Sequence, residues 1–292
     1  MKRNAVSRTQ IGKLLLVVLT ISSLLFALTY LILSFNNRFV SDDIALMNHF
    51  KESGWWGAIT EFEYSRRYTS HGLFHGLMCF TSDLKSSHAQ LFVFHVMVFI
   101  GFISGIYRVL NKLFPVEFLF SVSKFERVIL SVTLLIALFF GSMQLNEVWF
   151  WTISSVIHLL PLMFLLHCLA SIFTSNKQGW IHALIALLCG FYIGGASEVF
   201  AMVSLLLLTI LGLGQYYGVH KRKNVRLIKI GSAVIGNAGM LLWNVLGNKM
   251  NSRFEALSKR RDAASQSWSE DFFGAFIETR FIIFIFSNSN TS

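Results

Sequence analysis

Seven long apolar runs divide this chain of 292 residues, and they constrain its fold more than any other feature. A helix of about 20 apolar residues is long enough to cross a bilayer. With 54% hydrophobic residues and a mean hydropathy of +0.59, the chain carries more apolar surface than one water-soluble core can bury. We therefore predict an all-α polytopic membrane protein, a bundle of about seven transmembrane helices in a single transmembrane domain over 1–292. The predicted spans are Ile11 to Phe35, Leu91 to Leu110, Val128 to Ser142, Val156 to Thr174, Trp180 to Ile193, Val199 to Tyr216 and Leu227 to Leu246.

The charges between these runs predict the direction of the helices. Segments that we place in the cytoplasm carry 14 Lys and Arg residues and only two acids, Glu117 and Glu126, whereas the far side carries 12 of the 15 acids. Lys and Arg are enriched in the cytoplasmic loops of membrane proteins. We therefore expect a cytoplasmic N-terminus, and we attribute the net charge of +10 to topology rather than to binding of nucleic acid.

Two longer polar segments lie on the predicted outer side, a first outer loop at 36–90 and a second segment at 247–271. Within the first loop, Asp42 to Glu52 is predicted to form a helix that breaks at Gly54. Leu73 to Thr81 is apolar but too short to span, which favours a helix lying in the membrane interface. The first outer loop is therefore expected to carry interfacial helices.

The run Trp180 to Ile193 is only 14 residues long. At helical rise this is about 21 Å, shorter than a hydrocarbon core of about 30 Å. We therefore expect the following stretch, Gly194 to Glu198, to form a broken junction recessed below the outer surface. The chain then ends after an apolar stretch that begins at Phe272 and holds no complete final span, so the interpretation as a C-terminally truncated fragment of a longer protein stays open.

The adjacent acids Asp42 and Asp43 are the first candidates for chemistry, because they follow directly on the first span. A partly desolvated carboxylate beside basic groups can be tuned to act as a general base toward a hydroxyl. The alternative is an ordinary helix start, since Ser41 and the two acids also form a good N-terminal capping signal.

Tyr64, Arg66 and Arg67 lie in the same loop, and two neighbouring guanidinium groups are suited to clamp a phosphate or pyrophosphate. The same cluster is equally compatible with contact to lipid head groups. In the second outer stretch, Glu147 and the rings of Trp149 and Trp151 could hold a sugar, and an interfacial aromatic belt is just as compatible with them.

Glu198 is the acid hardest to explain as surface polarity, because a carboxylate between two short apolar helices must face protein or a water-filled cavity and find a partner. His158, one turn inside a span, is more typical of a packed residue than of a base, and no metal-ligand companion follows at i+4. The three cysteines are far apart and set among apolar residues, which indicates packing rather than a metal or disulfide framework. They are Cys79, Cys168 and Cys189.

Taken in order, five short motifs resemble those of DUF6056-type bacterial membrane proteins, which look like GT-C glycosyltransferases. The motifs are Ser41-Asp42-Asp43, Glu63-Tyr64 to Arg67, Phe150-Trp151 to Pro161, Gly195-Ala196-Ser197-Glu198 and Gly247-Asn248 to Arg253. The resemblance implies a GT-C-like bundle in the bacterial inner (cytoplasmic) membrane. It further implies transfer of a sugar from a polyprenyl-phosphate-linked donor to a cell-envelope glycan, lipid or protein on the outer face.

In that resemblance Asp43 is the catalytic base and Asp42 orients it or binds a divalent cation. Such a cation, Mg²⁺ or Mn²⁺, is optional in this class, and no metal ligand or certain cofactor is assigned. The substrate-binding residues implied are Tyr64, Arg66, Arg67, Glu147, Trp151, His158, Glu198, Asn248 and Arg253. Two other functions stay open: a transporter or flippase of lipid-linked sugars, and a non-catalytic subunit of envelope assembly. A transporter would place ionisable residues deep in several helices, where this sequence has almost none.

Overall fold

The computed structural model describes residues 3–37, 44, 48, 50–52, 54, 68–79, 87–113, 123–142, 146–174, 179–217 and 223–247. The chain divides into two compact units, Met1–Gly247 and Asn248–Ser292, and every described residue belongs to the first. The expectation of one domain over 1–292 therefore stays a prediction.

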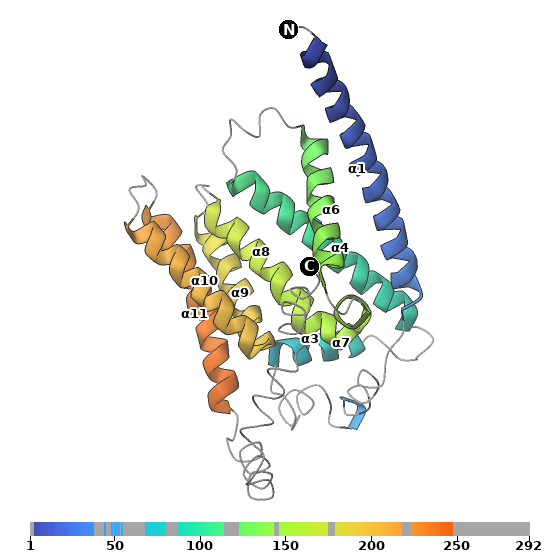
Figure 1. Cartoon of the computed structure of the whole chain (residues 1–292). Coiled ribbons are helices and arrows are strands. Elements are labelled where there is room, and N and C mark those ends of the chain that lie inside the picture. The colour runs from blue at the N-terminus through green and yellow to red at the C-terminus, as the bar shows by residue number, and fades with distance from the viewer. Residues whose placement is uncertain are drawn as a thin grey trace, which may run out of the picture. The chain divides into compact units, whose positions relative to one another are not determined.

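Throughout its described residues the first unit is helical and contains no strand (Figure 1). Its elements in chain order are α1 (Arg3–Phe35), α3 (Tyr68–Cys79), α4 (Ser87–Leu113), α6 (Lys124–Phe140), the π-helical turn η1 (Asn146–Phe150), α7 (Thr152–Ser154), a second π-helical turn η2 (Ser155–Leu159), α8 (Leu160–Phe173), α9 (Gly179–Ala196), α10 (Glu198–Tyr217) and α11 (Lys223–Gly247).

Six helical segments in the described part of the chain are long and apolar enough to cross a membrane. They are Gly12–Phe35, Ala89–Lys112, Thr152–Phe173, Gly179–Ala196, Glu198–Tyr217 and Val225–Trp243. The remaining predicted span corresponds to α6, an apolar helix of 17 residues. The prediction of an all-α, multi-pass membrane protein is confirmed.

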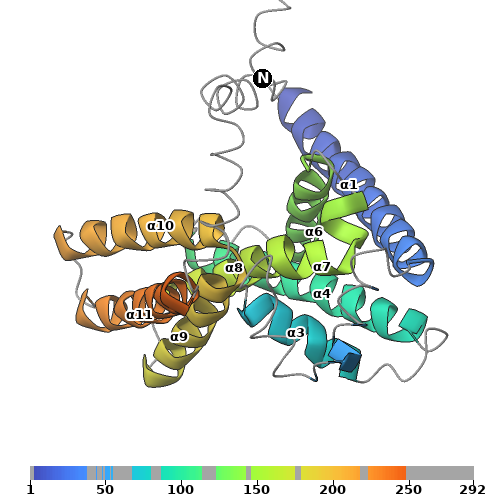
Figure 2. The same cartoon turned by 90° about the horizontal axis from the view of Figure 1, so that it is seen from below.

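The long helices alternate in direction, and α3 lies across one set of their ends. In Figure 1, α1 runs down from the N-terminus, α4 returns upward, and α6, α8, α9, α10 and α11 continue the alternation. Figure 2, seen from below, shows α3 beside α4 and α9 at the ends where α1 finishes and α8 begins. We call this side the α3 end and the other side the opposite end. At 12 residues, α3 is too short to span, as expected for an interfacial helix.

An aromatic cluster joins α1, α4 and α6 to the η1 turn. Tyr30 is stacked on Phe99 with ring centroids 4.9 Å apart, and Trp149 lies against Phe139 at 5.1 Å. Trp149 is fully buried, and its indole Nε1 donates to Ser142 Oγ at 3.1 Å. Both sequence-based interpretations of Trp149, a sugar platform and an interfacial belt, are therefore wrong, because the π-helical turn directs this ring into the core.

Close backbone packing joins α9 to α11. A Cβ atom on Gly190 would lie against the carbonyl of Ala233, 3.0 Å from its carbon and 3.1 Å from its Cα. A Cβ on Gly194 would lie 2.9 Å from the Cα and carbonyl carbon of Asn237. Small residues allow helices in a membrane to approach this closely, since packing rather than water exclusion holds them together.

This packing also corrects the expected length of the α9 span. The helix does not end at Ile193 but continues through both glycines to Ala196, giving 18 residues. Gly194 faces α11, and a Cβ on Gly195 would lie 2.7 Å from Thr69 Oγ1 of α3. The two glycines are thus sites of helix contact, and the break falls at Ser197, between α9 and α10.

Candidate functional site

Most of the residues predicted to carry chemistry lie outside the described residues. These are Asp42, Asp43, Tyr64, Arg66, Arg67, Asn248 and Arg253. Glu147 contributes its backbone to η1, and the side chains of Trp151, His158 and Glu198 are described. All three lie on or next to elements that meet at the α3 end of the helix bundle.

Ser70 and Thr69, at the start of α3, tie these elements together. The Ser70 hydroxyl is fully buried within reach of two carbonyl oxygens, Val156 O at 3.4 Å and Ala196 O at 3.3 Å. The Thr69 hydroxyl donates to the Tyr192 carbonyl at 2.8 Å, and the Tyr192 hydroxyl donates to Val156 O at 2.9 Å. Because α3 thereby joins η2 to the end of α9, the motif around His158 and the motif around Glu198 are held at the same end.

Glu198 opens α10 directly after the break at Ser197. The Ser197 carbonyl accepts the first bond of the new helix, from Ala201 N at 2.8 Å. A carboxylate in the first turn of a helix is favoured by the helix dipole. The side chain is half-buried, and among the described residues it forms no ion pair. Its expected partners, Arg66, Arg67 and Arg253, lie outside the described residues, so that pairing stays a prediction.

Trp151 and Thr152 form a polar site at the start of α7. Trp151 Nε1 and Thr152 Oγ1 are both buried, and neither has a hydrogen-bond partner within the described part of the chain. A buried donor without an acceptor costs about 1–3 kcal/mol, so such groups normally serve a ligand or a further polar contact. Trp151 therefore keeps its place among the candidate binding residues.

His158 differs from its sequence-based interpretation as a packed residue. Its side chain is exposed, whereas its neighbours Ile157 and Leu159 are buried. The π-helical turn explains the difference, because an i→i+5 turn rotates side chains out of the pattern that an α-helix would give. Exposure leaves the His158 ring accessible from outside the helix bundle.

His95 and Asn37, which sequence reasoning missed, connect α1 to this end. The fully buried His95 ring donates from Nδ1 to Leu91 O at 2.7 Å, which leaves Nε2 to accept from Asn37 Nδ2 at 3.3 Å. Asn37 Nδ2 also donates to Phe150 O at 2.5 Å. Asn37, which follows the end of α1, is thus fixed to α4 and to the residue before Trp151.

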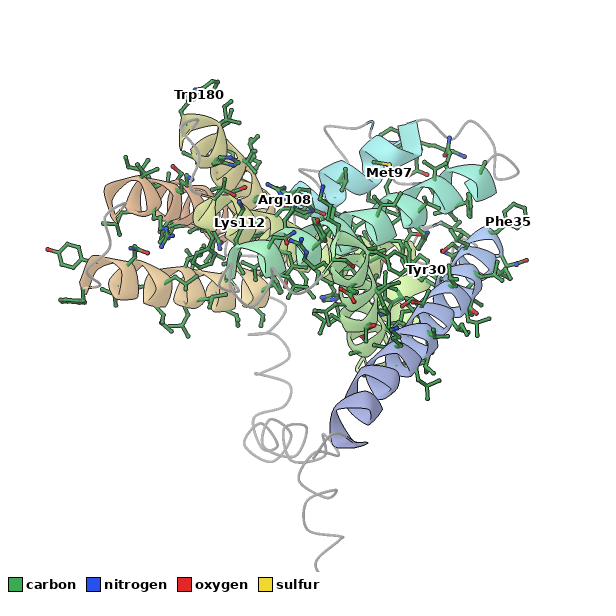
Figure 3. All side chains as sticks on the ribbon, turned by 90° about the horizontal axis from the view of Figure 1, so that it is seen from above. Tyr30, Phe35, Met97, Arg108, Lys112 and Trp180 are labelled. Carbon is green, nitrogen blue, oxygen red and sulfur yellow. The ribbon has the colours of Figure 1, made fainter. Side chains whose placement is uncertain are left out.

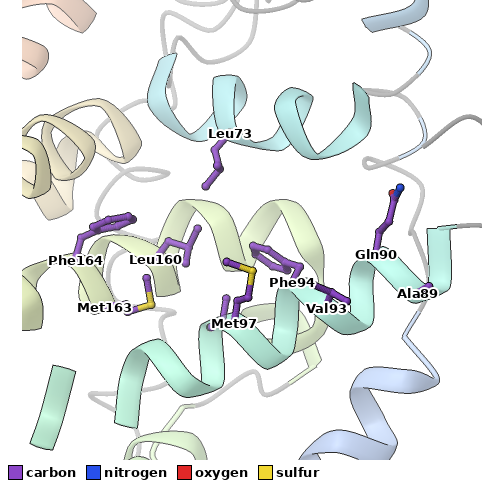
Figure 4. A pocket seen from close by; sticks show the side chains of 10 residues that line it. Leu73, Ala89, Gln90, Val93, Phe94, Met97, Leu160, Met163 and Phe164 are labelled. Atoms are coloured by element: carbon purple, nitrogen blue, oxygen red, sulfur yellow. The ribbon is translucent and has the colours of Figure 1, made fainter. Parts of the chain in front are cut away.

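A cavity of about 510 Å³ lies below α3, between α4 and α8. Its lining is apolar apart from the amide of Gln90. In Figure 4, Leu73 points down from α3 into the cavity, Phe94 and Met97 line it from α4, and Phe164 closes it from α8. The volume lies in the range of about 300–1,000 Å³ that is typical of small-molecule sites.

This cavity opens sideways, onto the surface that faces lipid. Val93 and Met97 are 54% and 66% exposed, whereas Phe94 and Val98 on the inner face of the same helix are buried. In a multi-pass membrane protein such an exposed apolar face contacts hydrocarbon. The arrangement is therefore suited to admit a lipid chain from the membrane and to hold it next to the interfacial helix.

Within the described residues no group of three or more His, Cys, Asp or Glu side chains is placed to hold a metal ion. The optional divalent cation depends on Asp42 and Asp43 and is not tested by these residues. Cys168 and Cys189 are buried free thiols, which confirms the packing role predicted for them.

Neither known protein families, nor curated proteins, nor solved structures gave a significant match to this chain. The GT-C resemblance therefore stays an expectation based on its sequence motifs.

Proposed function

We propose that this protein is a GT-C-like glycosyltransferase of the bacterial inner membrane, with a cytoplasmic N-terminus, which moves a sugar from a polyprenyl-phosphate-linked donor to an envelope acceptor. The observation that carries the proposal is the cavity beneath α3, because it is apolar, opens to lipid and lies at the end where Trp151, His158 and Glu198 gather. A lipid-linked donor needs an apolar site that binds its polyprenyl chain and polar groups that bind its sugar-phosphate head group. The α3 end offers the first of these and part of the second.

The proposed chemistry is a displacement at the anomeric carbon of the donor sugar. Asp43 removes the proton from an acceptor hydroxyl, whose oxygen forms the new glycosidic bond. The bond from the anomeric carbon to the phosphate oxygen breaks, and the electron pair leaves with polyprenyl phosphate. Arg66, Arg67 and Arg253 neutralise that phosphate, while Glu147 and Glu198 hold sugar hydroxyls or the basic residues themselves.

Of the alternatives, a transporter or flippase is less well supported by the distribution of ionisable groups. A translocation path needs charged or histidine side chains through the middle of several spans. In the described spans His95 and Glu198 lie toward the α3 end, and Arg108, His182 and Lys229 lie toward the opposite end. His167 of α8 lies nearer the middle, where its Nε2 bonds to Gly101 O of α4. Sugar transfer at one end of the bundle, beside a cavity that binds the lipid chain, agrees better with this distribution than a translocation path does.

Two substitutions test the proposal in the purified full chain, with a labelled polyprenyl-phosphate sugar and envelope extract as acceptor. Asp43→Asn should lower transfer by roughly 10² to 10⁴, the usual contribution of a positioned base. Met97→Trp should fill the cavity and raise the KM for the donor roughly tenfold with kcat unchanged, because overpacking costs about 1–3 kcal/mol and acts on binding of the chain.

The matched control for the cavity is Met202→Trp, on the lipid-facing surface of α10, where Met202 is 60% exposed and outside the cavity lining. Equal effects of the two tryptophans would remove the cavity from the donor site. Full transfer by Asp43→Asn would refute the catalytic assignment. Donor lipid crossing the bilayer without a glycosidic product would favour the flippase.

A further inference from the structure

Cationic side chains of α4 and α11 and a histidine of α9 lie toward the opposite end of the bundle, remote from the proposed transfer site. Arg108 and Lys112 lie one turn apart near the end of α4, His182 lies in the first turn of α9, and Lys229 lies near the start of α11. Figure 3 shows Arg108 and Lys112 at the end of α4 that is directed toward α9. We call these four residues the basic cluster.

Lys229 is the buried member of the cluster. Its ammonium group is fully enclosed and donates to two carbonyl oxygens at the end of α8, Thr174 O at 2.6 Å and Ser171 O at 3.3 Å. Carbonyls at a helix C-terminus carry partial negative charge and lack intrahelical donors. This contact holds α11 to α8, but it supplies no full negative charge to neutralise the lysine.

Arg108 likewise lacks a carboxylate partner among the described residues. Its Nη1 donates to His167 Nδ1 at 3.0 Å, while His167 Nε2 donates to Gly101 O at 3.0 Å. A histidine that accepts at one ring nitrogen and donates from the other is the neutral form. The Arg108–His167 bond therefore positions the guanidinium group and leaves its charge uncompensated.

The charges of this cluster act on one another and on His182. Lys229, Arg108 and Lys112 all exert a Coulombic effect on His182, and Arg226 and Lys112 both act on Lys229. The Nδ1 atom of His182 is buried and has no hydrogen-bond partner within the described part of the chain. Like charges that act on one another repel, and an anion beside them removes that repulsion.

The described acid at this end does not neutralise the cluster. Glu126 forms a capping box at the start of α6, where its Oε2 accepts from Ser123 N at 2.6 Å and Ser123 Oγ accepts from Glu126 N at 3.2 Å. Both partners are thus engaged with the helix terminus. Among the described residues at this end no carboxylate neutralises the cluster, and Glu117 lies outside them.

We propose that the basic cluster binds a phosphate group, most readily that of an anionic phospholipid head group at this face of the membrane, with Arg108 and Lys112 in contact with it and the enclosed Lys229 acting through its charge alone. Trp180, 71% exposed in the first turn of α9, marks this level of the helix as the interface, where tryptophan is enriched and lipid phosphates lie. Basic pockets between membrane helices are a recognised way to hold such head groups. Setting topology requires only that the charges stay on one side of the membrane, whereas here the charges of two helices act on one histidine of a third.

The test uses the purified full chain in detergent, titrated with phosphatidylglycerol or phosphatidylcholine and followed by native mass spectrometry. The protein should bind phosphatidylglycerol in clear preference. Arg108→Gln with Lys112→Gln should weaken that binding by about 25-fold, about fivefold for each lost cation, while leaving binding of phosphatidylcholine unchanged. Arg108→Lys with Lys112→Arg keeps both charges and should keep the preference.

A matched control removes two charges from the same end outside the cluster, with Lys13→Gln and Lys124→Gln, both at exposed positions. The control should retain the preference, and a thermal melt of each variant checks that it is folded. Excess inorganic phosphate that displaces the lipid would identify free phosphate as the occupant of the same site. Equal binding of both lipids without any effect of phosphate, or an equal loss in the control, would overturn the proposal.

Discussion

The contact between α9 and α11 makes the sharpest stability prediction, through the substitution Gly190→Ala. The added methyl group would lie against the Ala233 carbonyl, with backbone atoms at 3.0 and 3.1 Å. Backbone cannot rotate away as a side chain can, so we place the cost at the upper end of the overpacking range, about 3 kcal/mol. Alanine is favoured over glycine inside a helix by about 1 kcal/mol, which leaves a net loss of about 2 kcal/mol.

Gly239→Ala supplies the control, because a Cβ on Gly239 of α11 would meet no atom within 4 Å. That variant should gain up to about 1 kcal/mol from helix propensity alone. The two alanine variants are therefore expected to differ by about 3 kcal/mol. For a unit of this size, the loss in Gly190→Ala corresponds to a Tm about 4 to 8 °C lower.

The assay is thermal unfolding of the full chain in one detergent, followed by tryptophan fluorescence and repeated for both variants. Gly190→Ala should melt below the unmodified protein and Gly239→Ala at or above it. A Gly190→Ala variant as stable as Gly239→Ala would show that α9 and α11 do not pack backbone to backbone. It would also remove the physical reason given above for the continuation of α9 through its glycines.

The other predictions concern a helix cap, two thiols and the topology. Lys229→Met should lower the free energy of unfolding by about 1–3 kcal/mol, measured by denaturant or thermal unfolding, because the last carbonyls of α8 lose their donor. In a Cys79→Ser background, maleimide should label Cys168 and Cys189 only after unfolding, and rapid labelling of the folded protein would contradict their burial. Reporter fusions should show the two sets of loops on opposite sides of the membrane. The outer set is fusions after Thr81, Leu145 and Asn251, and the cytoplasmic set is fusions after Leu113, Lys177 and Arg222.

The spanning helices could be predicted because the thickness of the hydrocarbon core sets how many consecutive apolar residues a spanning helix needs. Their ends could not, because a helix continues beyond the hydrocarbon until its backbone groups find other partners. The predicted run Val128 to Ser142 belongs to a helix that begins at Lys124, because the capping box of Ser123 and Glu126 satisfies the N–H groups of its first turn. For α9, the glycines that looked like a break are instead the places where neighbouring helices approach.

The interfacial helix was predicted in kind but not in extent. Leu73 to Thr81 was chosen for its apolar residues, whereas α3 spans Tyr68–Cys79 and begins with the polar pair Thr69 and Ser70. The carbonyls that these hydroxyls contact lie 86 to 126 residues away in the chain. No local pattern reports such a partner, since any buried backbone carbonyl can accept.

The spacing of glycines in α4 and α9 carries information that the apolar pattern alone does not. The glycines at 101 and 105 and at 190 and 194 have the four-residue spacing typical of close helix pairs in membranes. That spacing predicts close packing of α4 and α9 but not their partners, which the structure gives: a Cβ on Gly105 would lie 3.0 Å from Leu166 Cβ of α8. Only the π-helical turns, which set the directions of Trp149 and His158, have no such sequence signature.

The enclosed Lys229 also affects the order in which the chain can assemble during synthesis. A lysine within a spanning helix raises the cost of transfer from the translocon into lipid, by up to about 2.5–3.5 kcal/mol at a helix centre. Its acceptors, the carbonyls of Ser171 and Thr174, belong to α8 and leave the ribosome before α11 does. Helix α11 therefore has a docking partner already in the membrane when it emerges, and its entry depends on α8 being in place. Truncation or misfolding of α8 should leave α11 poorly inserted although its own sequence is unchanged.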